Sequence, residues 1–96
     1  MNQFFEELGR HWVAAAKRRG VDIDRPALDS RVALELLELA RVAAHTQERR
    51  FAPLTSYTAG VAAERLRAAR PDIDDAAIAE MILEVRRELE GESAGR

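Results

Sequence analysis

Residues 28–45 read LDSRVALELLELARVAAH, and this run decides the fold class. Its apolar side chains recur every three or four residues, which is the spacing of one face of an α-helix. The face consists of Leu28, Val32, Leu36, Leu39 and Ala43. Further apolar residues at 33, 37, 40 and 44 widen it well past a right angle. Since apolar cover this wide needs neighbours on several sides, we expect a central helix that other helices surround.

Glycine and proline breaks divide the rest of the chain into further segments with helical apolar spacing. These breaks are Gly20 to Pro26, Ala52-Pro53 and Pro71-Asp72. The sequence predicts helices at about 2–19, 27–49, 53–70 and 73–90, followed by a flexible C-terminal tail over 91–96. The second helix begins near Pro26 or, alternatively, near Asp29-Ser30. Because the connections are short, antiparallel neighbours are expected, and residues 1–90 are predicted to form a compact, bundle-like, all-α single domain of about four helices.

Individual residues in these breaks carry their own predictions. Asn2 is a reasonable N-cap for the first helix, and Gly20 suits a left-handed position after its end. Either Asp72 or Asp74 is expected to cap the fourth helix, which Gly91 is expected to end. Gly60, in the middle of a predicted helix, is expected where another helix or backbone approaches closely.

Composition excludes several classes of function. Fifteen basic residues against seventeen acidic ones give a net charge of −2, which is not the excess of basic charge that nucleic-acid binding requires. There is no cysteine, so thiol chemistry and cysteine zinc sites are absent. No apolar run approaches membrane-spanning length, and acids stand where a signal peptide would be basic. We therefore expect a cytoplasmic protein without a membrane or nucleic-acid partner and without a cofactor.

The polar strip of the second predicted helix is the first candidate site. Arg41, His45 and Arg49 follow one another at i, i+4 intervals and project side by side. Thr55 lies near the start of the next helix, whose N–H groups would complete a notch for a phosphate or carboxylate. The alternative is structural, because basic residues near a helix C-terminus stabilise the helix dipole without binding any ligand.

A second candidate is the stretch Phe51–Ala63, thirteen residues without a charge in a chain that is 33% charged. If part of it stays outside the core, it marks an interface with a partner or a second copy of the chain. The interface residues would be Phe51, Leu54, Tyr57 and Val61. The alternative is that the aromatic residues are all core, namely Phe4, Phe5, Trp12, Phe51 and Tyr57.

Catalytic and metal chemistry find little support in the sequence. His11 and His45 are the only histidines, and neither belongs to a metal-binding motif. No serine lies in a nucleophile elbow, and no triad can be assembled from so few candidates. We therefore predict no catalytic residue, no metal site and no enzyme activity.

The region around Arg41, His45 and Arg49, where the second and third predicted helices join, also contains a recognisable motif. The stretch LELARVAAH over residues 37–45, then Arg49, then APLTSY over 52–57 with GVA from Gly60, resembles the signature of a small helical family of unknown function. That family has an LDLAR-x-x-AH…APLT-like motif, and some members look to be associated with molybdenum-cofactor guanylyltransferase-like proteins. Here Glu38 stands where aspartate is commoner, and the linker over 22–30 is longer than expected.

The resemblance implies a motif but no activity that can be transferred. Its positions fall on Leu39, Ala40, Arg41, His45, Arg49, Ala52, Pro53, Leu54, Thr55 and Gly60. The sequence thus predicts a non-catalytic accessory or protein-interaction module, with self-association as one form of it. The alternative is a binder of a small anionic ligand at the Arg41, His45 and Arg49 corner, linked through the resemblance to molybdenum-cofactor metabolism.

Overall fold

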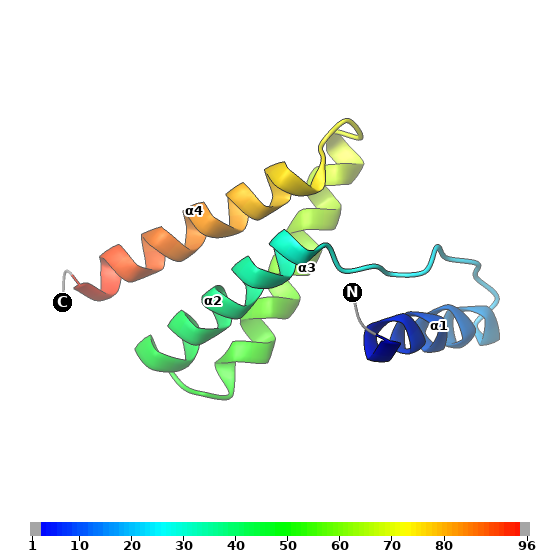
Figure 1. Cartoon of the computed structure of the whole chain (residues 1–96), viewed down its shortest axis with the longest axis horizontal. Helices are drawn as coiled ribbons and strands as arrows, with labels where there is room; N and C mark the ends of the chain where they lie inside the picture. The colour runs from blue at the N-terminus through cyan, green and yellow to red at the C-terminus, as the bar shows by residue number, and fades with distance from the viewer. Residues whose placement is uncertain (1–2, 95–96) are drawn as a thin grey trace. The chain divides into compact units, whose positions relative to one another are not determined.

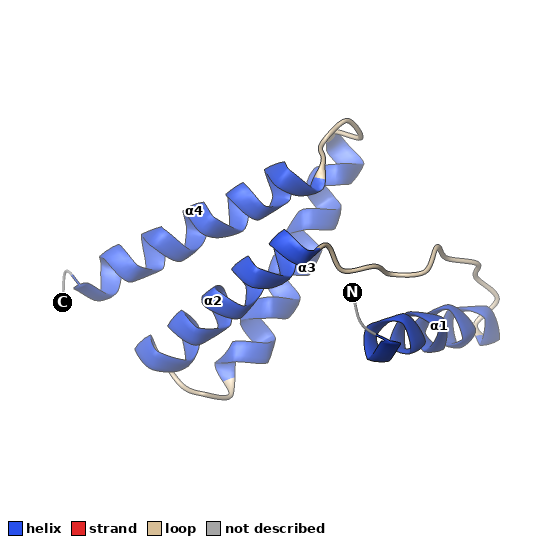
Figure 2. Cartoon of the chain, viewed as in Figure 1, coloured by secondary structure: helices blue, strands red, loops and turns tan. Residues whose placement is uncertain are grey.

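The computed structural model of the chain describes residues 3–94, which form four α-helices and no strand (Figures 1 and 2). The helices are α1 (Gln3–Arg18), α2 (Ser30–Thr46), α3 (Phe51–Ala69) and α4 (Asp75–Ala94). The all-α prediction is confirmed. The predicted cap at Asn2 and the last two residues of the predicted tail lie outside the described part. The chain divides into an N-terminal unit, Met1–Ser30, and a three-helix unit, Arg31–Arg96.

The N-terminal unit consists of α1 and a return segment, residues 21–29, that folds back along it. Gly20 has a φ of +81° and follows the helix end. Its N–H donates to the Lys17 carbonyl, and the Val21 N–H donates to the Ala16 carbonyl, which is a Schellman motif. The left-handed position predicted for Gly20 is therefore confirmed.

Gly9 is the buried residue of α1 and marks where the return segment passes. A Cβ atom built there would lie 2.7 Å from Cγ of Arg25 and 2.9 Å from the carbonyl oxygen of Pro26. Both distances are shorter than van der Waals contact. Glycine is thus what allows the backbone of the return segment to approach the helix.

In the three-helix unit, α3 runs back against α2 and α4, as Figure 1 shows. The centre of the core consists of Leu39 from α2, Ala63 from α3, and Ile78 and Ile82 from α4. Each of these is at most 7% exposed. Because every helix of the unit contributes an apolar stripe, the three stripes bury one another.

Local chemistry explains most helix boundaries. Of the two predicted caps for α4, Asp74 acts: its Oδ1 accepts the Ala77 N–H at 2.9 Å. α3 begins at Phe51 rather than at residue 53. Pro53 is tolerated there because it lies in the first turn, where its missing N–H breaks no helical hydrogen bond. α2 begins at Ser30 and ends at Thr46, so it is shorter at both ends than the predicted 27–49. Of the two starts considered for it, the later one is correct.

The predicted helix end at Gly91 is wrong, because α4 continues to Ala94. A glycine inside a helix costs only about 1 kcal/mol relative to alanine, which good helix formers on either side can offset. The close approach predicted at Gly60 is also wrong, since no heavy atom outside its own helix backbone lies within 4 Å of a Cβ built there.

Apolar exposure contradicts two further expectations. Leu34 and Leu37 of α2 are 58% and 70% exposed, so one side of this helix is not covered by α3 or α4. The aromatic residues are not core either. The exposed fraction ranges from 37% to 74% across Phe4, Phe5, Trp12, Phe51 and Tyr57. Within residues 3–94, no helix combines the length and the apolar character that crossing a membrane requires.

Candidate functional site

The predicted basic corner is only partly assembled. Arg41 and His45 are both exposed residues of α2, but Arg49 lies beyond the helix end, in the turn over 47–50. Its side chain therefore does not continue the i, i+4 row that the sequence predicted. Thr55 lies on α3 and lines a pocket that includes none of the three basic residues.

Arg41 is already engaged in an ion pair. Its Nε donates to Oε2 of Glu38 at 2.8 Å, one helical turn earlier. This hydrogen bond, reinforced by the charge of Arg41, lowers the pKa of Glu38 below its ordinary value. The same contacts raise the pKa of Arg41. The side chains of His45 and Arg49 are exposed and form no hydrogen bond or ion pair with the part of the chain that the structure describes.

The N-terminus of α3 does not supply the backbone donors that an anion notch needs. The Phe51 N–H donates to the Glu48 carbonyl at 3.0 Å, and the Ala52 N–H donates to the Arg49 carbonyl at 3.1 Å. Pro53 has no N–H. Since Phe51, Ala52 and Pro53 leave no free N–H in the first turn, hydrogen bonds to an anion at this corner would come mainly from side chains.

An apolar groove with a volume of about 380 Å³ lies between α3 and α4 of the three-helix unit. Leu39 of α2 contributes to its lining, and both other helices contribute small or apolar side chains. They are Thr55, Thr58, Ala59 and Ala62 from α3, and Met81, Ile82, Val85 and Leu89 from α4. The groove thus offers an apolar surface without a charged side chain in its lining.

The predicted interface residues lie on the same helix as the α3 wall of this groove. Leu54 is 61% exposed, Tyr57 is 74% exposed and Phe51 is 37% exposed, whereas Val61 is half-buried. Exposed apolar side chains are common singly, but three of these four lie within the seven residues 51–57.

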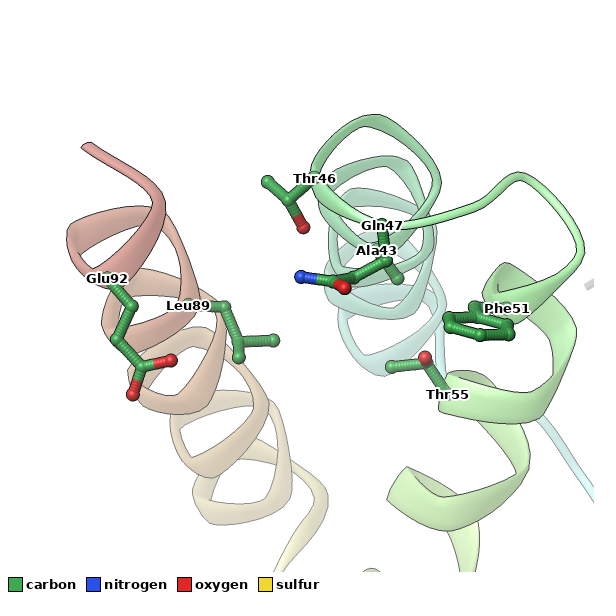
Figure 3. A pocket seen from close by; sticks show the side chains of 7 residues that line it. All are labelled: Ala43, Thr46, Gln47, Phe51, Thr55, Leu89 and Glu92. Carbon is green, nitrogen blue, oxygen red and sulfur yellow. The ribbon is translucent and has the colours of Figure 1, made fainter. Parts of the chain in front are cut away.

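A second hollow, here called the corner pocket, lies where the end of α2, the start of α3 and the end of α4 meet (Figure 3). Its volume is about 330 Å³. Ala43, Phe51 and Leu89 give it apolar walls, while its polar groups belong to Thr46, Gln47, Thr55 and Glu92. Thr55 and Leu89 also line the groove, so the two hollows adjoin.

The side chains of Glu35 on α2 and Arg86 on α4 form a partly buried ion pair between the two helices. Their closest atoms, Glu35 Oε2 and Arg86 Nη2, are 3.7 Å apart, and the side chains are only 16% and 17% exposed. Arg86 also donates through Nη1 to Glu90 at 2.7 Å. The buried Oε2 of Glu35 and Nε of Arg86 have no hydrogen-bond partner in the described structure.

Sequence reasoning missed both Glu92 and the Glu35–Arg86 pair. Glu92 was assigned to the tail, although it follows Val85 by seven residues and so continues the same helix face. Glu35 and Arg86 were detectable as opposite charges placed beside apolar stripes on two helices. For metals, the described residues hold no group of three or more His, Cys, Asp or Glu side chains able to bind an ion.

Comparison with known proteins yields one family. A family model described as a domain of unknown function, DUF6457, matches residues 6–95, which is nearly the whole chain. No curated protein and no solved structure matches.

Proposed function

The chain belongs to the DUF6457 family, whose function is unknown, and we propose that it is a non-catalytic protein-interaction module. The observation that carries this proposal is the groove of about 380 Å³ between α3 and α4, lined almost entirely by apolar atoms. An apolar surface of this kind is unfavourable in contact with water, and it stands out on a chain that is 33% charged. Covering it by an apolar partner surface is therefore favourable.

The occupant we propose is an amphipathic helix of a partner protein, with basic residues beside its apolar face. Helices dock into grooves of this type through apolar side chains at i, i+3, i+4 and i+7. Glu92, which lines the adjoining corner pocket, follows Val85 by seven residues, so the α4 side of the groove ends in an acid. The α3 side has no charge from Phe51 to Ala63. Charge complementarity thus favours a basic flank.

Two synthetic amphipathic peptides with the same leucine and alanine face test this proposal. One carries lysine flanks and the other glutamate flanks, and each is titrated into the ¹⁵N-labelled chain. The lysine peptide is expected to shift amide signals over 55–62 and 81–89. It is expected to bind about tenfold more tightly than the glutamate peptide, a difference of about 1.4 kcal/mol.

The matched variants are Ala62→Glu, in the groove lining, and Ala68→Glu, on the same helix outside the groove lining. Both alanines are exposed, so neither change is expected to unfold the chain. Ala62→Glu should abolish peptide binding, while Ala68→Glu should leave it unchanged. Equal loss in both variants, or peptide signals that shift outside the groove, would contradict the assignment.

A second candidate is a small anionic ligand at Arg41, His45, Arg49 and Thr55. Its support is that the side chains of His45 and Arg49 are exposed and form no hydrogen bond or ion pair in the described part of the chain. Two cationic or protonatable side chains on one corner favour a phosphate or carboxylate. In molybdenum-cofactor metabolism, which the sequence motif suggests as a setting, this anion would be a nucleotide or a pterin phosphate.

Thermal-shift measurements with inorganic phosphate and GTP test the second candidate. A ligand at about a hundredfold excess over its Kd stabilises a protein by about 2.7 kcal/mol, so even weak binding raises the melting temperature. Arg49→Ala should remove the shift, and Arg50→Ala is its neighbouring control. If phosphate and GTP produce no shift at millimolar concentration, the anion site is ruled out.

A further inference from the structure

We propose that the corner pocket binds a small organic cation, meaning a protonated amine or guanidinium on an apolar stem. This goes beyond the interaction role, because the pocket shares only Thr55 and Leu89 with the groove and adds polar groups that the groove lacks. Its volume of about 330 Å³ is at the lower end of the range for small-molecule sites. The ligand class follows from which groups line it.

The polar groups of the pocket come from three helix ends and their connecting turn (Figure 3). Glu92 stands on the α4 side, and Thr55 stands opposite it on α3. The carboxamide of Gln47 extends from the end of α2 toward α4. Polar groups from different parts of the chain thus converge on one hollow with apolar walls, which is the usual composition of a ligand site.

The Gln47 carboxamide and the Thr55 hydroxyl can both donate and accept, whereas the other two polar groups are acceptors. The Thr46 hydroxyl donates its proton to the Val42 carbonyl at 2.8 Å, so its oxygen is left to accept. The Glu92 carboxylate accepts only, and among the described residues of the lining it is the charged one. Because Arg41, His45 and Arg49 are not part of the lining, the pocket favours a donor with positive charge.

The apolar walls determine what carries this cation. The ring of Phe51 lies on the α3 side, facing the hollow, and Leu89 lies on the α4 side (Figure 3). An aliphatic or aromatic stem between them would cover apolar surface while its cationic end meets Glu92. A cation close to the Phe51 face would gain a further attraction from the ring.

Three small probes with similar phenylalkyl stems test the charge preference. They are 2-phenylethylamine, the neutral 2-phenylethanol and the anion 3-phenylpropionate, each titrated into the ¹⁵N-labelled full chain. The amine is expected to shift signals over 43–47, 51–55 and 89–92, and to bind about tenfold more tightly than the alcohol. The carboxylate is expected to bind more weakly than the alcohol.

Glu92→Gln retains shape and removes the charge, and Glu84→Gln makes the same change on α4 outside the pocket. Glu92→Gln should weaken amine binding about tenfold without changing that of the alcohol. Glu84→Gln should change neither. The proposal is overturned if Glu92→Gln leaves the amine affinity unchanged, if the carboxylate binds as tightly as the amine, or if the shifts lie outside the pocket.

The same cation could arrive as a side chain of a docked helix, and a peptide arm separates the two sources. A lysine-flanked peptide is compared with one that carries norleucine in place of the terminal lysine. If the free amine binds alone, the site takes a free ligand. If only the lysine peptide shifts the Gln47 and Glu92 signals, the cation belongs to the partner. Failure of the peptide in the groove leaves the free-amine result intact, so this proposal and the interaction role fail separately.

Discussion

Replacing Ile78 with alanine tests whether the three-helix unit depends on its central core. Ile78 is 1% exposed and packs with Leu39, Ala63 and Ile82, so each helix of the unit touches this cluster. Truncating a buried isoleucine to alanine costs about 2–5 kcal/mol, and a side chain this completely buried belongs near the middle, at about 3 kcal/mol. Proteins have about 0.05–0.15 kcal/mol of stability per residue, or roughly 5–14 kcal/mol for this chain. The substitution thus removes a large share of the total.

Urea titration followed by far-UV circular dichroism measures this loss. With an m-value of about 1–3 kcal/mol/M, the midpoint should fall by about 1–3 M at an unchanged m-value. The melting temperature should fall by about 12–24 °C, since 1 kcal/mol corresponds to about 4–8 °C at this size. Leu37→Ala is the control, because this leucine is 70% exposed and its change should cost at most about 0.5 kcal/mol. If both variants lose the same stability, the assigned core is wrong.

Three further predictions follow from the polar contacts and the tight approach at α1. By NMR, the Glu38 carboxyl should titrate below its ordinary pKa, and Arg41→Gln should move this pKa back upward. Because the folded pKa is lowered, the pair stabilises the fold above the unfolded pKa, and this stability is lost as the pH falls through the folded pKa. In urea titration, Arg86→Met should cost about 1–3 kcal/mol by leaving a partly buried Glu35 uncompensated, and the double variant with Glu35→Leu should recover most of this loss. If the double variant loses as much stability as Arg86→Met alone, the two side chains do not interact. Gly9→Ala should increase helix content while moving the return segment, seen as amide shifts over 25–27; shifts confined to α1 would refute the close approach.

The helices themselves were predictable because their signals are local. The apolar spacing of α2, the left-handed position at Gly20 and the acidic cap before α4 each depend on a few neighbouring residues. The end of α4 was not predictable from Gly91 alone. A glycine lowers helix stability by about 1 kcal/mol, and its effect depends on the residues beyond it.

The candidate site was less predictable because it depends on contacts between distant segments. The sequence singled out Phe51 for the uncharged stretch and Thr55 for the anion notch, and both residues line the corner pocket. Glu92 reaches the same pocket from the other end of the sequence, and only the packing of α4 beside α2 and α3 brings it there. Likewise, the row of Arg41, His45 and Arg49 required α2 to extend beyond Thr46, where it ends.

The closed first turn of α3 has a consequence for how this corner can change in evolution. Since the Phe51 and Ala52 N–H groups are already bonded and Pro53 has none, these three positions offer no free backbone donor to an anion. Selectivity then depends on a few exposed side chains, of which Arg49 and Glu92 have opposite charge. Substitution at these positions leaves the helix start intact. A charge change at Arg49 or Glu92 would thus alter the electrostatics of this corner without removing a backbone hydrogen bond from the start of α3.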